Sequence, residues 1–308
     1  MGNVPKIAVI GAGNVGATLA MRIAESGLAE VVLLDVYKSL AQGKALDIFD
    51  SSGMNHSLRP IQGTDDFSSI SGSSIVVITA GLARTPGMAR EELALKNAVI
   101  VKAISSEIRL RAPDSVIIVV TNPLDTMTYL AYKTSAFPRA KVLGMAGVLD
   151  ESRFKALIAS ELNVETNDIE TVIMGGHGDT MVPVLSHTRV KKALLMELLP
   201  EKKIDELIIR IRGRGAEIVS LLGSGSAYYS PSLAAFRMAE AIVYDRKEVI
   251  TASVFLNGEY GLRDICAGVP VKLGRSGIEE IVEIKLTDRE RSLFMESARV
   301  IRQGNAKL

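Results

Sequence analysis

A glycine-rich turn near the start of the chain constrains its fold more than any other feature. The turn reads Gly11-Ala12-Gly13-Asn14-Val15-Gly16, follows the apolar run Lys6–Ile10 and opens a helical pattern. In this G-x-G-x-x-G spacing, Gly11 permits a tight turn, Gly13 lets the backbone approach a pyrophosphate, and Gly16 lets the helix pack closely on the strand. The motif predicts a βαβ unit that binds a dinucleotide at the amino end of its first helix, with all six residues of the turn at the cofactor.

Short β-branched runs alternate with longer helical patterns through the first half of the chain. Strands separated by helices imply parallel βαβ units with right-handed crossovers, and strands that are nearly all apolar are typical of a sheet covered on both faces. We therefore predict an α/β fold with a Rossmann, doubly wound parallel sheet over residues 1–149, followed by a mixed α+β substrate domain over residues 150–308. The expected parallel strands are Lys6–Ile10, Glu30–Asp35, Ile75–Thr79, Ser115–Thr121 and Lys141–Gly144.

Three local patterns make narrower predictions. A helix is expected from Asp150 to Leu162. Ser39 with Gln42 has the spacing of a capping box, which predicts the start of another helix. Asn257-Gly258 separates two apolar runs, so an antiparallel hairpin with a two-residue turn is expected there.

Composition narrows the choice of partners. Of 308 residues, 47% are apolar, which suffices for a large core, and 36 basic against 35 acidic residues give a formal net charge of +1. This balance argues against a nucleic-acid or membrane-surface partner. Cys266 is the only cysteine, so we expect no disulfide and no thiolate metal site. The polar start Met1–Lys6 and the lack of an apolar stretch of about 18 residues favour a soluble, cytoplasmic protein.

Asp35 closes the second strand about twenty residues beyond the glycine turn, where a carboxylate accepts hydrogen bonds from the adenosine ribose. The same charge repels a 2′-phosphate, so NAD is favoured over NADP, although nearby Lys38 leaves some tolerance for NADP. The alternative is a capping or surface acid. Val120-Thr121-Asn122 ends a later strand, where Asn122 either orients a carbonyl or the nicotinamide or serves as a turn residue before proline. Asn97 lies on the preceding helix and could also reach the cofactor.

His177 is the best acid–base candidate in the sequence. It lies between Gly176 and Gly178, which clear space around it, whereas His56 lies in a polar loop and His187 in a mixed strand. A histidine in such a setting, in a chain with a nicotinamide site, suits proton transfer near neutral pH.

Two further groups of charged side chains are candidates for the site. Asp150 and Arg153 are three residues apart at a helix start and share one face, so they either serve the histidine and a substrate or form an intrahelical ion pair. The Gly/Pro-punctuated loop Ala83–Arg90 carries Arg84 and Arg90 at the end of a buried strand. Because a guanidinium binds carboxylate or phosphate through two parallel hydrogen bonds, this loop indicates an anionic substrate.

Taken together, the motifs resemble those of the lactate/malate dehydrogenase superfamily over essentially the whole chain. The likeness is strongest to the lactate-dehydrogenase-like branch of malate dehydrogenases. Six motifs carry it, in the expected order and near the expected spacing: GAGNVG, Asp35, the ARTPGMAR loop, VTNP, Leu149–Arg153 and GGHGD.

The resemblance implies a role for each matching residue. His177 is expected to exchange a proton with the substrate C2 oxygen while a hydride moves to or from nicotinamide, and Asp150 to orient its imidazole. Arg153 is expected to bind the C1 carboxylate. Arg90 is expected to close over the site with its loop and polarise the C2 carbonyl, and Asn122 to contact both substrate and cofactor.

Arg84 is expected to decide the substrate. Malate members of the family carry an arginine here that pairs with the second carboxylate, whereas lactate members typically carry glutamine. The physics agrees, since pyruvate would leave Arg84 unpaired in a closed site, at a cost of several kcal/mol. The resemblance thus implies NAD-dependent, reversible oxidation of the dicarboxylate (S)-malate to oxaloacetate, a step of the tricarboxylic acid cycle, by a homotetramer or dimer.

Three alternatives stay open at this point. A lactate or other 2-hydroxyacid dehydrogenase is disfavoured by Arg84. A non-catalytic NAD-binding redox sensor has no need of an acid–base pair such as His177 with Asp150. An NAD-dependent glycosidase usually needs a metal, and the sequence shows no Cys/His ligand cluster.

Overall fold

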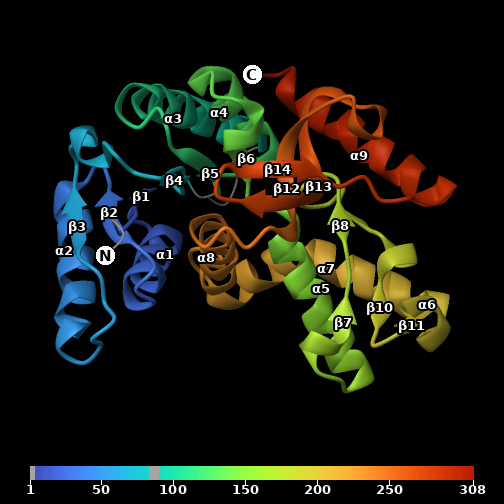
Figure 1. Ribbon diagram of the computed structural model, residues 1–308. Helices are drawn as coiled ribbons and strands as arrows, with labels where there is room; N and C mark the ends of the chain where they lie inside the picture. Colours follow the sequence, from blue (N-terminus) through green and yellow to red (C-terminus); the bar gives the residue numbers. More distant parts are fainter. Residues whose placement is uncertain (1–3, 83–89) are drawn as a thin grey trace.

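The computed structural model describes residues 4–82 and 90–308, the side chain of Arg90 excepted. A nine-stranded sheet, in the order β14-β13-β12-β6-β5-β4-β1-β2-β3, runs through the molecule (Figure 1). Its six parallel strands are β1 Lys6–Ile10, β2 Glu30–Leu34, β3 Ile61–Thr64, β4 Ile75–Ile78, β5 Val116–Val119 and β6 Val142–Gly144. The three antiparallel strands are β12 Glu248–Asn257, β13 Arg263–Gly274 and β14 Gly277–Ile281.

The order β3-β2-β1-β4-β5-β6 is that of a doubly wound dinucleotide-binding sheet, which confirms the predicted Rossmann fold. Helices α3 (Arg90–Arg111) and α4 (Leu124–Ser135) cover one face of the sheet. Helices α1 (Asn14–Glu25) and α8 (Tyr229–Val243) cover the other (Figure 1). The strands are apolar throughout because both faces are buried: in β1, Ile7 and Val9 join one core cluster and Ala8 and Ile10 join the opposite one.

The second half of the chain continues the same sheet. Strand β12 pairs antiparallel with β6, with Ser253 opposite Gly144. The remaining helices are α2 Lys38–Asp50, α5 Gly147–Leu162, α6 Leu195–Leu198, α7 Glu201–Leu222 and α9 Asp288–Asn305. Short antiparallel pairings complete the fold, and they join β7 Ile169–Glu170, β8 Ile173–Met174, β9 Val182–Pro183, β10 Arg189–Val190 and β11 Ala193–Leu194. The two halves therefore share one sheet.

The predicted starts of two helices need correction. Helix α5 begins at Gly147, three residues before Asp150, so Asp150 lies within its first turn. Helix α2 begins at Lys38 with Tyr37 at its N-cap and no side-chain cap, so the expected capping box at Ser39 is wrong. The cause is upstream, since the Asp35 carboxylate accepts a hydrogen bond from the Tyr37 N–H and turns the chain directly into the helix.

The hairpin at Asn257 forms, but its turn is longer than expected. Strands β12 and β13 pair antiparallel as predicted. Asn257 is the last residue of β12, and a short 3₁₀ turn over Glu259–Gly261 connects the strands. Glu259 accepts a hydrogen bond from the Asn257 N–H, and the Gly258 N–H bonds to the Leu262 carbonyl, which stabilises this wider turn.

Within residues 4–82 and 90–308, no helix has the length and apolar character needed to cross a membrane. The same part of the chain contains no group of three or more His, Cys, Asp or Glu side chains placed to hold a metal ion.

Candidate active site

The glycine turn joins the carboxyl end of β1 to α1, and its three glycines have different steric surroundings. Gly11 has a φ of +109°, and a Cβ on it would lie 2.6 Å from the backbone nitrogen of Ala80. A Cβ on Gly16 would lie 1.8 Å from the Gly11 carbonyl oxygen, so only glycine allows α1 to pack on the turn. A Cβ on Gly13 would have no heavy atom of the described residues within 4 Å, so among these residues Gly13 faces open space. The turn thus suits a bound pyrophosphate at Gly13.

Asp35 stands at the rim of this turn. Its Oδ2 accepts a hydrogen bond from the Ala12 N–H at 2.6 Å, and its Oδ1 accepts one from the Tyr37 N–H at 3.0 Å. Lys44, which the sequence analysis did not single out, donates from Nζ to the Ala12 carbonyl at 2.8 Å. Lys38 forms an ion pair with Asp65 at 3.3 Å. A carboxylate fixed beside the open turn fits an adenosine ribose, and thus NAD.

The ends of β4 and β5 lie beside the turn. The buried Thr121 hydroxyl donates to the Ala80 carbonyl at 2.7 Å. The Asn97 side chain is buried, and its amide donates to the Asn122 carbonyl at 2.8 Å while its oxygen accepts from the Leu82 N–H at 2.8 Å. Asn97 therefore connects the two strand ends, and the side chain of Asn122 remains exposed at the sheet edge.

His177 and Asp150 form a close pair. Nδ1 of His177 lies 2.8 Å from Oδ2 of Asp150, and the two side chains are 17% and 2% exposed. Since a carboxylate can only accept, Nδ1–H donates to it, and Nε2 is left to exchange a proton. The structure thus brings together two of the residues that the sequence proposed.

Several residues that sequence reasoning missed fix the loop around His177. The His177 N–H donates to Oδ2 of Asp125 at 2.8 Å, and the Ser253 hydroxyl donates to Oδ1 of the same carboxylate at 2.7 Å. The Gly176 N–H donates to the Ser297 hydroxyl at 2.8 Å. Asp125 is buried and follows Asn122 by three residues, so it ties the histidine loop to the cofactor side of the site.

These contacts alter two pKa values. Burial alone would lower the pKa of His177, but the charge and hydrogen bond of Asp150 outweigh it, and the pKa is raised above the ordinary histidine value. Burial raises the pKa of Asp125, although hydrogen bonds from Ser253 and His177 oppose the rise. The imidazolium form of His177 therefore persists to higher pH than that of a free histidine.

Arg153 lies on the same face of α5 as Asp150. Its Nη1 is 3.8 Å from Oδ1 of Asp150, which is long for a hydrogen bond. Among the residues that the structure describes, Arg153 Nε and Asp150 Oδ1 are buried and have no hydrogen-bond partner. Burial lowers the pKa of the Arg153 guanidinium, and Asp150 partly offsets this. A buried guanidinium with a free donor suits an anionic ligand.

The two loop arginines fall outside this description. Arg84 lies in the segment 83–89, beyond the described residues. Arg90 is the first residue of α3, and its side chain is likewise outside the description. Their expected roles stay predictions.

The site therefore combines a dinucleotide-binding turn, a ribose-side carboxylate and a histidine–aspartate pair. This combination is typical of dehydrogenases, in which the protein positions the cofactor and supplies acid–base chemistry to the substrate. Residues 5–144 match the family model described as lactate/malate dehydrogenase, NAD binding domain. Residues 147–307 match lactate/malate dehydrogenase, alpha/beta C-terminal domain. The chain belongs to the lactate/malate dehydrogenase family, with NAD as its cofactor.

Individual relatives agree with this assignment. The chain is 49% identical to malate dehydrogenase of Methanosarcina mazei, over 98% of this chain and 99% of that protein. The crystal structure of Cryptosporidium parvum malate dehydrogenase superposes with a TM-score of 0.96 at 37% identity, covering 99% of each chain. Lactate dehydrogenase from the same organism, complexed with lactic acid and β-nicotinamide adenine dinucleotide, gives 0.96 at 39% identity, over 99% of this chain and 98% of that one.

The steric contrast between two glycines gives a matched pair of variants. Gly16→Ala is expected to destabilise the protein by roughly 2 kcal/mol, because its Cβ overlaps the Gly11 carbonyl. Gly13→Ala is expected to keep the wild-type unfolding midpoint and to weaken NADH binding, because its Cβ occupies the open space. Denaturant unfolding and fluorescence titration with NADH measure both. Equal stability of the two variants would contradict the assigned packing.

The His177–Asp150 pair predicts a pH dependence. Because the folded-state pKa of His177 is raised, the pair stabilises the protein fully below the unfolded-state pKa, and this stability is lost as pH rises through the folded pKa. In Asp150→Asn the pKa of His177 is expected to fall. An NMR titration of the imidazole measures it, with His177→Asn used to assign the resonance. An unchanged pKa in Asp150→Asn would show that another group raises it.

Proposed function

We propose that this protein is an NAD-dependent malate dehydrogenase that reversibly oxidises (S)-malate to oxaloacetate. The observation that carries the proposal is the buried cluster of His177, Asp150 and Arg153, in which an acid–base group lies beside a guanidinium whose Nε has no partner among the described residues. Malate as the substrate is supported by relatives named malate dehydrogenase and by Arg84 in the sequence.

Bound at the glycine turn and Asp35, NAD would supply the hydride acceptor for C2 of malate, and NADH would supply the hydride donor for oxaloacetate. His177 accepts the C2 hydroxyl proton at Nε2 during oxidation and donates it back during reduction. Asp150 keeps Nδ1 protonated through its 2.8 Å hydrogen bond and stabilises the imidazolium that forms. The raised pKa of His177 favours the protonated form needed for reduction of oxaloacetate.

The arginines bind the two carboxylates and the carbonyl in this proposal. Arg153 binds the C1 carboxylate, which neutralises its buried charge. Arg90 polarises the C2 carbonyl, and Arg84 pairs with the C4 carboxylate. Asn122 contacts both substrate and cofactor. Because pyruvate lacks that second carboxylate, it leaves Arg84 unpaired and is a poorer substrate.

The proposal gives each half of the chain a different role. Residues 1–149 bind the dinucleotide and residues 150–308 provide the acid–base pair. NAD is assigned to the glycine turn and the strand ends, at Gly11, Ala12, Gly13, Asn14, Val15, Gly16, Asp35, Asn97, Val120, Thr121 and Asn122. A cytoplasmic location and a place in the tricarboxylic acid cycle belong to the same proposal.

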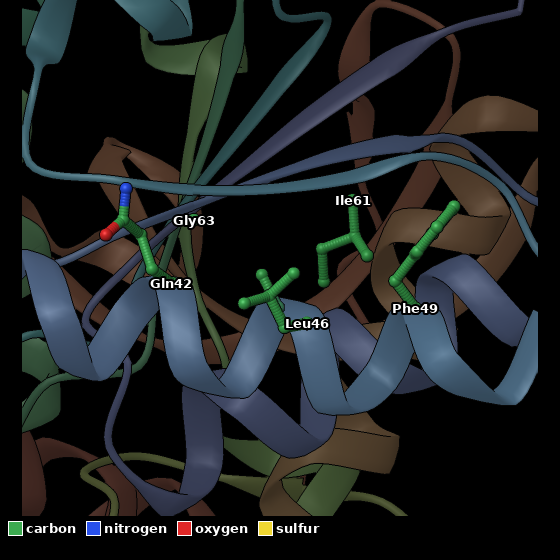
Figure 2. A pocket seen from close by; sticks show the side chains of 6 residues that line it. Gln42, Leu46, Phe49, Ile61 and Gly63 are labelled. Carbon is green, nitrogen blue, oxygen red and sulfur yellow. The ribbon is translucent and has the colours of Figure 1, made fainter.

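A homo-oligomer, tetramer or dimer, is also part of the proposal, and the surface of α2 supports it. Leu46 and Phe49 are 64% and 48% exposed on this helix, and Met54 just beyond it is 84% exposed. Figure 2 shows Leu46 and Phe49 on the side of α2 that faces Ile61, where they border a shallow groove. The residues that line this groove are Gln42, Ala45, Leu46, Phe49, Ile61 and Gly63. An apolar face of this kind suits contact with a second copy of the chain.

The substrate assignment is tested by a paired assay. Wild-type protein is expected to oxidise NADH rapidly with oxaloacetate and slowly with pyruvate. In Arg84→Gln, preference is expected to shift toward pyruvate by about 2–5 kcal/mol in kcat/KM, as for loss of one member of a buried charge pair. His177→Asn serves as a control and is expected to lose turnover with both acids. Equal wild-type rates with the two acids would overturn the malate assignment in favour of a broader 2-hydroxyacid dehydrogenase.

The oligomer is tested by one charge on α2. Leu46→Asp is expected to reduce the molar mass measured by light scattering, because it places an unpaired charge in the contact. Leu110→Asp is the control, since Leu110 is 73% exposed on α3. A wild-type mass of one chain, or a Leu46→Asp mass equal to that of wild type, would place the oligomer contact elsewhere or exclude it.

A further inference from the structure

Glu151 is a largely enclosed carboxyl group that the proposed mechanism does not use. It follows Asp150 in α5, and its Oε1 atom has two hydrogen-bond partners on other elements. The Ile173 N–H, in β8, donates to it at 3.3 Å, and the Thr251 hydroxyl, in β12, donates to the same atom. We call these three residues the Glu151 bridge.

The Glu151 bridge connects the elements that carry the catalytic pair. Helix α5 carries Asp150, and β8 leads through Gly175 and Gly176 to His177. Strand β12 also carries Ser253, whose hydroxyl donates to Asp125, the carboxylate that accepts from the His177 N–H. A displacement of α5 against β8 would therefore change the distance between the aspartate and the histidine directly.

The backbone of α5 packs tightly against β8 and β12. A Cβ on Gly147, in the first turn of α5, would lie 2.3 Å from Thr251 Cγ2 and 2.8 Å from the Ile173 carbonyl oxygen. The backbone of α5 thus touches the same two residues that Glu151 binds. Glycine permits the close approach, and Glu151 supplies the polar contact that fixes its direction.

We propose that Glu151 is a positioning residue for the dehydrogenase reaction, because it holds α5 against β8 and β12 at the separation that pairs Asp150 with His177. The proposal rests on the function proposed above. Glu151 does not touch the reacting atoms and acts only through Asp150 and His177.

The electrostatics of Glu151 decide which substitution preserves the bridge. Burial raises the pKa of Glu151 to about 7, with hydrogen bonds and Lys155 opposing the rise and Asp150 adding to it. Its partners in β8 and β12 are neutral. Both bonds end on Oε1, so a proton on Oε2 leaves them in place. Because the amide oxygen of glutamine accepts in the same position, Glu151→Gln is expected to keep the bridge.

The experiment compares three variants with wild type. Glu151→Ala and Thr251→Val remove the bridge from either side, and Glu151→Gln preserves it. Thr171→Val is the matched control, since Thr171 is a buried threonine of the same half whose hydroxyl bonds to Thr188 and not to the carboxyl group of Glu151. Thermal unfolding and NADH titration establish that each variant is folded and binds cofactor.

Loss of the bridge is expected to lower kcat for oxaloacetate reduction about tenfold or more, because a displacement near 1 Å misaligns the reacting groups. The KM for NADH is expected to stay at the wild-type value. The descending limb of the kcat/KM profile is expected to move to lower pH, because His177 loses part of the stabilisation that Asp150 provides. Glu151→Gln and Thr171→Val are expected to match wild type.

An NMR titration of His177 separates this proposal from the proposed function. If wild-type protein does not reduce oxaloacetate, the function fails, yet the imidazole pKa still reports on the bridge. A lowered His177 pKa in Glu151→Ala and Thr251→Val, restored in Glu151→Gln, supports the positioning role. An unchanged His177 pKa and kcat in folded Thr251→Val would overturn it, as would a Glu151→Gln variant as impaired as Glu151→Ala.

Discussion

The 2.8 Å hydrogen bond between His177 and Asp150 is the interaction on which the rest of this molecule depends. Asp150 lies on a helix and His177 lies in a glycine-rich loop. The two residues are 27 positions apart in the sequence, so no local structure brings them together. Their separation is set through Asp125, Ser297 and the Glu151 bridge, which accept hydrogen bonds from backbone N–H groups of the segment that leads to His177. The Gly176–Ser297 contact is buried and the other two are partly buried, and a missing partner at a buried position costs about 1–3 kcal/mol. The geometry of one proton-transfer group thus depends on residues from both halves of the chain.

One sheet makes this distribution possible. The pairing of β6 with β12 places Ser253 next to Gly144, so the cofactor half and the acid–base half share backbone hydrogen bonds. Asp125 lies on the cofactor side of this junction and binds the histidine loop across it. A mixed sheet therefore gives the two halves a fixed relation that a flexible linker could not. The proposed hydride transfer at C2 and proton transfer at the C2 oxygen both need that relation.

The sequence was sufficient for features whose partners are near in the chain or whose spacing repeats a known steric solution. The glycine turn between β1 and α1, the apolar parallel strands and the presence, though not the start, of the helix that carries Asp150 belong to this group. It was insufficient where the partner is distant: Asp125 meets His177 across 52 residues, and Gly176 meets Ser297 across 121. A serine or threonine in a strand pattern carries no sign that its hydroxyl ends at a catalytic loop. The capping box at Ser39 failed for a related reason, because Asp35 had already redirected the chain at Tyr37.

The carboxylate of Asp35 has a consequence for engineering. Both of its oxygens accept hydrogen bonds from backbone N–H groups, one from Ala12 in the glycine turn and one from Tyr37 before α2. Exchanging it for a residue without a side-chain acceptor, to admit a phosphorylated cofactor, would remove the partners of both N–H groups and would destabilise the region around the ends of β1 and β2. A replacement such as asparagine, which retains one acceptor, combined with compensation at Tyr37, is the more promising starting point for altering nucleotide choice.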